Sequence, residues 1–238
     1  MNKALFSKIK KIIPKISSTE MIALRSGTTS IDRDLFSGKV NLDDYDYKTK
    51  SKKFPDHLVD ELLRKYGKEQ VYPGTKTSEI TDFLGKNKFW SFIINEHYEG
   101  TNLSVNEISS ILTKITSESP SIGVITMVPN SLGPGELLLH YGTEEQKDKY
   151  LPGLSNGVYI PCFGLTGPNN GSDATGQIDT GKIIKGNNGK LQIEVTIKKR
   201  YITLGPVSKL SGLAFRVEDP DQLWDSKKSG VTVALLEK

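Results

Sequence analysis

The chain has 238 residues, of which 36% are hydrophobic and 25% are charged, and its formal net charge is +4. This balance is typical of a folded globular protein and excludes a disordered chain. The positive surplus is too small to indicate a nucleic-acid surface, and no basic run alternates with aromatic residues. No apolar stretch reaches about 18 residues, so no transmembrane helix is predicted. The single cysteine, Cys162, excludes an internal disulfide and fits a reducing compartment.

Residues 1–53 are predicted to form a basic N-terminal helix and a linker. The helix over "MNKALFSKIKKIIPKIS" has an apolar face made by Leu5, Ile9, Ile12 and Ile13. Such a face fits an interfacial membrane helix or a helix packed against another part of the protein. Pro14 and the lack of a small-residue cleavage site argue against a secretory signal. We therefore expect a cytoplasmic protein, with peripheral contact at the inner membrane as the alternative.

Residues 54–157 have a helical pattern. "PDHLVDELLRKYG" begins with proline and ends with glycine, and "TSEITDFLGKNKFWSFII" is a second helix that runs into an apolar segment. Ser104 with Glu107 and Thr143 with Gln146 have the spacing of capping boxes, which predicts helices after Ser104 and Thr143. Between them, "SIGVITMVPNSLGPGELLLHYG" predicts two apolar helices with a break at 129–135. This region is predicted to be an all-α bundle.

Residues 158–238 have a strand pattern. "YIPCFGLT" is a short apolar run, and "IIKGNNGKLQIEVTIKK" predicts a hairpin that turns at 186–189. After the turn, Leu191, Ile193, Val195 and Ile197 alternate with polar residues, which predicts one buried and one solvent-facing side. "LSGLAFRV" and "GVTVALLEK" are further strands. Because the sequence stops on an apolar strand, we expect an incomplete β domain in a fragment of a longer protein.

Most of the isolated reactive residues carry no predicted chemistry. The three histidines, His57, His97 and His140, are scattered and have no metal-ligand spacing. Cys162 lies in an apolar run and is predicted to be a small core residue. The loop "CFGLTGPNNGSD" that follows is different, because its glycines allow close backbone approach to a ligand and Thr166 and Ser172 add hydroxyl groups.

Three motifs, in the correct order, resemble the acyl-CoA dehydrogenase family. They are Gly164-Leu165-Thr166-x-Pro168-x-x-Gly171-Ser172-Asp173, the triplet Tyr201-Ile202-Thr203, and "HYGTEEQKDKYLPGLSNG". Two phrases, "VPNSLGPGELLLHYGTEEQKDKYLP" and "KRYITLGP", are similar to the long bacterial acyl-CoA dehydrogenases of fatty acid β-oxidation. The resemblance covers nearly the whole chain. It implies an α+β multidomain fold, with an N-terminal all-α helical bundle before a β-barrel-like middle domain, truncated here, and a C-terminal helical domain beyond Lys238.

The resemblance also implies chemistry. The family removes a proton from the α carbon of a fatty acyl-CoA and passes a hydride from the β carbon to N5 of FAD, which yields a trans-2-enoyl-CoA. The residues that would bind FAD are Phe163, Leu165, Thr166, Gly171, Ser172, Tyr201, Ile202 and Thr203. Of these, Ser172 would also lie near the CoA arm, and Thr203 would lie close to N5. The expected partners are a fatty acyl-CoA, an electron-transferring flavoprotein as electron acceptor, and further copies of the full-length chain in a homo-oligomer.

The sequence departs from the family pattern at two positions. Gly167 replaces the usual acid, and Tyr201 stands where many members have tryptophan. The family's base is a carboxylate in the C-terminal domain, so we expect no catalytic residue in this chain and no dehydrogenase activity from it alone. Two alternatives remain: another flavoprotein on the same scaffold, either an acyl-CoA oxidase or a flavin monooxygenase, and a non-catalytic binding or assembly protein that keeps the fold.

Overall fold

The computed structural model describes residues 7, 21, 25, 31–45, 52–69, 76–174, 176, 179–224 and 230–238. The predicted N-terminal basic helix lies outside these residues. The chain divides into two compact units, residues 1–49 and residues 50–238. In the first unit, α3 (Asp32–Ser37) ends at Gly38, whose φ of +68° closes the helix, and a 3-10 turn, Leu42–Tyr45, follows.

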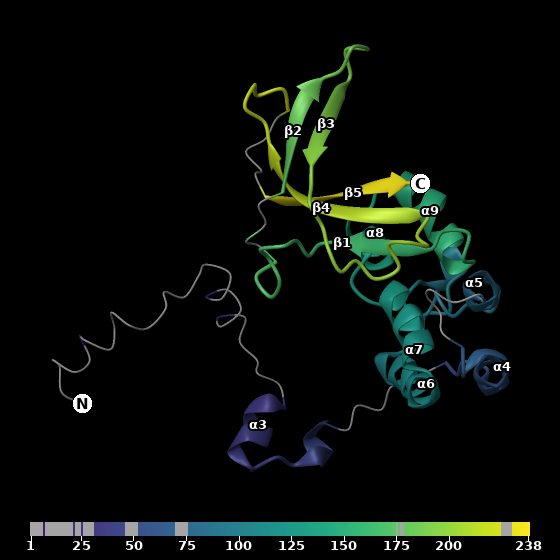
Figure 1. Cartoon of the computed structure of the whole chain (residues 1–238). Coiled ribbons are helices and arrows are strands. Elements are labelled where there is room, and N and C mark those ends of the chain that lie inside the picture. Colours follow the sequence, from purple (N-terminus) through teal and green to yellow (C-terminus); the bar gives the residue numbers. More distant parts are fainter. Residues whose placement is uncertain are drawn as a thin grey trace. The chain divides into compact units, whose positions relative to one another are not determined.

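Six α-helices occupy the described N-terminal part of the second unit (Figure 1). They are α4 (Asp56–Tyr66), α5 (Thr77–Lys86), α6 (Val105–Glu118), α7 (Pro120–Met127), α8 (Pro134–Tyr141) and α9 (Glu144–Ser155). Short 3-10 helices lie at Glu96–Tyr98 and Val128–Asn130. Each helix predicted for residues 54–157 is present, and strands begin at Pro161. The prediction of an all-α region followed by strands is therefore confirmed.

The predicted caps are formed in two different ways. At α9, the Thr143 hydroxyl accepts the Gln146 N–H and the Gln146 side chain accepts the Thr143 N–H, so the capping box is complete. At α6, the Ser104 hydroxyl accepts the Glu107 N–H at 3.3 Å. The Glu107 carboxylate, however, accepts the backbone N–H of Phe54 at 3.0 Å. The predicted box at α6 is thus only half confirmed, because its carboxylate ties a distant segment to the helix.

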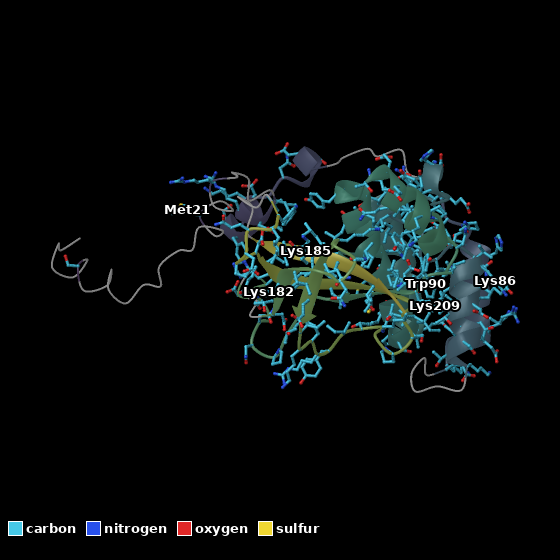
Figure 2. All side chains as sticks on the ribbon, turned by 90° about the horizontal axis from the view of Figure 1, so that it is seen from above. Met21, Lys86, Trp90, Lys182, Lys185 and Lys209 are labelled. Atoms are coloured by element: carbon cyan, nitrogen blue, oxygen red, sulfur yellow. The ribbon has the colours of Figure 1, made fainter. Side chains whose placement is uncertain are left out.

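The helical core is aromatic. Phe54 packs edge-on against Phe89 and Phe92, with ring centroids 4.9 and 5.0 Å away. Trp90 lies among the helices (Figure 2), and its indole N–H donates to the Ile125 carbonyl at 3.0 Å. The buried amide of Asn130 bonds to the backbone of Phe89, Phe92 and Thr126. The Trp90 indole and the Asn130 amide inside this core are therefore paired with the backbone that surrounds them.

The apolar stretch Pro120–Tyr141 has the length and mean hydropathy of a membrane span, and 56% of its most apolar window is buried inside the fold. It is not one continuous α-helix, since α7 ends at Met127 and α8 begins at Pro134. Its composition therefore fits a pair of core helices.

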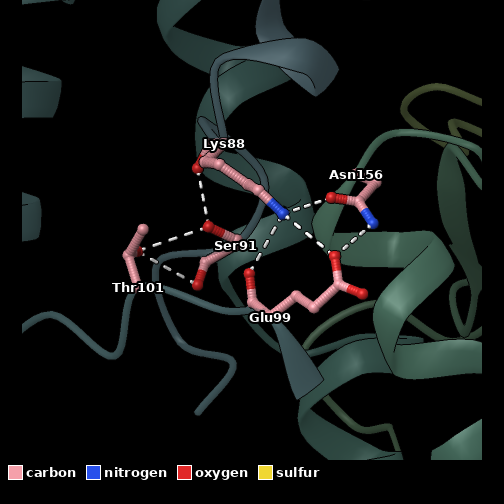
Figure 3. A network of polar contacts seen from close by, with 5 residues as sticks. All are labelled: Lys88, Ser91, Glu99, Thr101 and Asn156. Atoms are coloured by element: carbon pink, nitrogen blue, oxygen red, sulfur yellow. Dashed lines mark hydrogen bonds and ion pairs between the residues drawn. The ribbon is translucent and has the colours of Figure 1, made fainter. Parts of the chain in front are cut away.

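A polar network joins the loop after α5 to the end of α9 (Figure 3). The Lys88 ammonium contacts the side-chain oxygen of Asn156 and the carbonyl of Glu99. The Asn156 amide donates to the Glu99 carboxylate at 2.7 Å. That hydrogen bond, and then the charge of Lys88, hold the pKa of Glu99 below its usual value. The network fixes the point at which the chain leaves the helices for the sheet.

The sheet is built on its longest strand, β4 (Leu210–Glu218). The other strands are β1 (Pro161–Gly164), β2 (Thr180–Lys185), β3 (Leu191–Thr196) and β5 (Val231–Glu237). β1 and β2 pair with β4 in parallel, at opposite ends of it, and β5 pairs with it antiparallel. In Figure 2, Lys182 and Lys185 of β2 lie far from Lys209, which directly precedes β4, so β2 meets β4 near its C-terminal end.

The sheet described is open, so the barrel-like closure included in the fold prediction is not seen in the described residues. Among the described strands, β3 pairs only with β2, and β5 pairs only with β4. The contact of β2 with β4 covers just Thr180–Lys182. The β2–β3 hairpin therefore extends past the end of β4, where no described strand meets it (Figure 1).

The predicted hairpin itself is confirmed. Gly186 donates its N–H to Lys190, and Gly189 adopts a φ of +74°. The expectation of a continuous buried side is wrong at the tip, because Leu191 and Ile193 are exposed. They lie on the part of the hairpin that has passed β4, where no described strand pairs with it.

Candidate functional site

The two motifs of the strand region, the glycine-rich loop and the Tyr201-Ile202-Thr203 triplet, lie side by side. The loop 164–173 follows β1, and the triplet 201–203 lies between β3 and β4. The Arg200 backbone N–H donates to the Thr166 carbonyl at 3.3 Å. The Arg200 guanidinium donates to the Pro168 carbonyl at 3.0 Å, across 32 residues of sequence. The fold therefore brings the predicted loop and the predicted triplet together.

The loop residues differ in exposure. Phe163 is half-buried, and its ring lies so close to Gly212 on β4 that a Cβ there would be 3.1 Å from it. Leu165 and Thr166 are half-buried, whereas Gly171 and Ser172 are exposed. The first three residues thus form the base of the loop, and Gly171 and Ser172 are accessible at its outer part.

The triplet presents its first and third residues to solvent. The Tyr201 side chain is 85% exposed, and Thr203 is also exposed. Ile202 packs against the helical core. Tyr201 has a φ of +59°, a backbone region that costs a non-glycine residue about 1 kcal/mol or more and that occurs often at ligand sites. The backbone thus turns the Tyr201 ring away from the core.

Gly167, where the sequence departs from the family pattern, has a steric reason to be glycine. A Cβ at this position would lie 2.4 Å from the side-chain oxygen of Asn170. Asn170 is buried, and its amide donates to the Leu165 carbonyl at 3.3 Å. The Gly167 N–H donates to the Asn170 carbonyl, which closes the turn. The amide of Asn170 therefore occupies the space beside Gly167, and the two residues depend on each other.

A buried ion pair supports the same loop. The Lys199 ammonium lies 2.5 Å from the Asp179 carboxylate, and both side chains are 6% exposed. Lys199 also donates to the Leu165 carbonyl at 3.0 Å, and Asp179 accepts the Lys198 N–H at 2.8 Å. Sequence reasoning missed this pair. A signal was available, because Lys199 continues the alternation of Leu191, Ile193, Val195 and Ile197 and so falls on the inward-facing side.

The arrangement offers a ligand one backbone donor and one aromatic ring. The Thr166 N–H makes no hydrogen bond within the part of the chain that the structure describes. The exposed ring of Tyr201 belongs to the adjoining segment. A flat ligand with acceptor atoms on its edge could use both, with the ring on its face and the peptide N–H on its edge. These features fit a flavin.

A cleft of about 920 Å³ lies elsewhere, and none of the predicted cofactor residues lines it. Residues from α8, α9 and β5 line it, including Leu137, Tyr141, Lys149 and Val233. At its rim, Lys149 and Tyr150 both contact the Glu237 carboxylate, which raises the pKa of Lys149 and lowers that of Glu237. These contacts hold β5 against α9.

Cys162 is buried, and its thiol donates to the Ser211 hydroxyl at 3.2 Å, which confirms it as a core residue. Among the described residues, no group of three or more His, Cys, Asp or Glu side chains is placed to hold a metal ion.

Comparison with known proteins agrees with the motifs. Residues 46–158 match the family model described as "Acyl-CoA dehydrogenase, N-terminal domain". An acyl-CoA dehydrogenase of Bacillus subtilis is 30% identical over 189 residues, which cover 76% of this chain and 47% of that protein. Butyryl-CoA dehydrogenase from Megasphaera elsdenii has a TM-score of 0.59 at 20% identity, over 80% of this chain and 50% of that one. Acyl-CoA dehydrogenase complexed with FAD from Bacillus anthracis has a TM-score of 0.55 at 20% identity, over 76% of this chain and 27% of that one.

The fold is that of the acyl-CoA dehydrogenases. Over residues 46–158 the chain matches the N-terminal domain of this family, and the resemblance expected from the motifs is confirmed. The chain matches 47% of the length of the Bacillus subtilis acyl-CoA dehydrogenase and 41% of a 3-(aryl)acrylate reductase from Clostridium sporogenes, so it spans less than half of these relatives.

Proposed function

We propose that this chain contributes the flavin-binding face of an FAD-dependent acyl-CoA dehydrogenase, which converts a fatty acyl-CoA to a trans-2-enoyl-CoA in β-oxidation. The observation that carries the proposal is the junction of the two motif segments. Arg200, which directly precedes the triplet, bonds to the carbonyls of Thr166 and Pro168, and this supports a shared surface of the loop and the triplet. Segments that carry two separate motifs of the family, far apart in the sequence, are therefore in contact.

We assign proposed roles on this surface to Thr166, Ser172, Tyr201 and Thr203. The Thr166 N–H would donate to the pyrimidine edge of the flavin, and the Tyr201 ring would cover the isoalloxazine from water. The Thr203 hydroxyl would lie near N5, and the exposed Ser172 would contact the diphosphate and the CoA arm. When bound, FAD accepts the hydride from the β carbon of the substrate. Donors aimed at the ring then stabilise the negative charge of the reduced form.

The resemblance assigns the base to a part of the family fold that follows the middle domain. We therefore propose that the 238-residue chain binds FAD without turning over acyl-CoA. An electron-transferring flavoprotein is the proposed acceptor for the whole enzyme, and a homo-oligomer is its proposed assembly. Turnover of palmitoyl-CoA by the purified chain would contradict the first of these statements.

Titration of the purified chain with FAD tests the proposal, with flavin fluorescence and the visible absorption of oxidised flavin as readouts. The test variant is Tyr201→Ala and the matched control is Tyr141→Ala, since the two rings are 85% and 83% exposed. Loss of a stacking ring costs about 1.4 kcal/mol, so Tyr201→Ala should weaken FAD binding about tenfold. Tyr141→Ala should leave it unchanged. Equal effects of the two variants, or a wild-type chain that binds no FAD, would overturn the proposal.

A further inference from the structure

The Lys199–Asp179 ion pair lies directly beneath the proposed flavin surface. Among the described residues, it is the only ion pair in which both side chains are less than a tenth exposed. Removing two charges from water is costly, and their attraction often does no more than offset that cost. Because stability alone explains such a pair poorly, its role is sought in the groups that it holds in place.

The pair connects the two motif segments and the sheet. Lys199 donates to the Leu165 carbonyl in the loop. Asp179, just before β2, accepts the Lys198 N–H and offers its own carbonyl to Arg216 on β4. The ion pair thus ties the segment that leads to Tyr201 to the sheet and to the loop, in addition to the hydrogen bonds that Arg200 makes with the loop.

The Leu165 carbonyl receives two donors, the Lys199 ammonium at 3.0 Å and the Asn170 amide at 3.3 Å. In a trans peptide the C=O of one residue and the N–H of the next point in opposite directions. A clamped Leu165 carbonyl therefore fixes the direction of the Thr166 N–H, which makes no hydrogen bond within the described residues. Donors on the carbonyl also polarise the amide and make its N–H a stronger donor.

We propose that Lys199, held by Asp179, is a positioning residue for the cofactor: it orients the Leu165–Thr166 peptide so that the Thr166 N–H faces the flavin edge. The inference rests on the proposed function, because it requires FAD to bind at this surface. Lys199 itself does not touch the cofactor. Its contribution is the direction and the strength of one backbone donor.

The test compares FAD dissociation constants of the full 238-residue chain. Lys199→Met with Asp179→Asn removes both charges, so neither is left buried and unpaired. The control is Lys198→Met, which removes the same lysine charge one residue away on an exposed side chain. The double variant should bind FAD about tenfold more weakly and shift the visible spectrum of the bound flavin, because the edge donor is misdirected. Lys198→Met should bind FAD within about twofold of wild type.

Lys199→Arg keeps a charged donor within reach of Asp179 and Leu165, so it should restore affinity to within about threefold of wild type. It also keeps the inference testable if the double variant proves unfolded by circular dichroism. Unchanged affinity and spectrum in the folded double variant would overturn the inference while the proposed function stands, and so would a Lys199→Arg chain that is folded but as weak as the double variant. A wild-type chain that binds no FAD would overturn both.

Discussion

The helical and strand regions of the second unit use buried polar groups for different ends. In the helices, the indole of Trp90 and the amide of Asn130 bond to backbone groups of the core that surrounds them. In the strand region, the buried apolar cluster of the sheet is small, consisting of Ile183, Phe215 and Val217. The buried ion pair there holds a loop carbonyl. The Trp90 and Asn130 hydrogen bonds thus stabilise the helical core, whereas the buried ion pair in the strand region holds a surface loop in place.

The largest expected effect lies in the helical core. Trp90 is 1% exposed and Trp224 is 47% exposed, which makes a matched pair of tryptophans. Trp90→Ala should lower the free energy of unfolding by about 3–5 kcal/mol, because it leaves a cavity and an unpaired Ile125 carbonyl. Trp224→Ala should change it by less than about 1 kcal/mol. Urea denaturation measures both, and equal losses would contradict the placement of the core.

Gly167→Ala should mainly affect the loop. Its Cβ would meet the Asn170 oxygen at 2.4 Å, so the turn must shift, with a loss of about 1–3 kcal/mol in stability and weaker FAD binding. In Gly167→Ala combined with Asn170→Ala, the clash is absent. Asn170→Ala should therefore cost less stability in the Gly167→Ala chain than in the wild-type chain. Strictly additive losses in this double-mutant cycle would contradict the dependence of Gly167 on Asn170.

Glu107 links the segment before α4 to α6 and gives a pH-dependent test. The hydrogen bond from the Phe54 N–H, and to a smaller extent the hydrogen bond and charge of Lys53, hold the pKa of Glu107 below its ordinary value. A lowered carboxyl pKa adds stability that is present above the unfolded pKa, about 4.3, and is lost as the pH falls through the folded value. Glu107→Gln should destabilise the chain by about 1 kcal/mol at neutral pH. This difference from wild type should shrink below about pH 4 in acid titrations followed by circular dichroism, and a constant gap would contradict the assignment.

The smallest expected effect is at the hairpin tip. Ile193 is exposed because the hairpin has passed the end of β4. Ile193→Thr should change the free energy of unfolding by less than about 0.5 kcal/mol, whereas Ile183→Thr, at a buried position of the same hairpin, should cost about 2 kcal/mol. Similar losses at the two sites would indicate that the tip is covered.

Local sequence signals predicted most of the helical region, because caps and periodic apolar residues act over a few positions. Pro55 and Gly67 bound α4, and Thr143 with Gln146 starts α9, as expected. The open sheet and the exposed Ile193 could not be predicted in this way, because they depend on where β2 leaves β4. The site motifs were recognised from their order, and the fold brings them together. The Lys199–Asp179 pair was missed because the alternation places Lys199 on the inward-facing side but does not identify Asp179, which lies before β2, as its partner.

Hydrogen exchange of the chain with and without FAD tests the central claim most directly. If the loop 163–174 and the segment 198–203 form the flavin surface, FAD should slow exchange in peptides from these two segments and leave the cleft lined by α8, α9 and β5 unchanged. Protection confined to that cleft, or no protection in either motif segment at saturating FAD, would contradict the account.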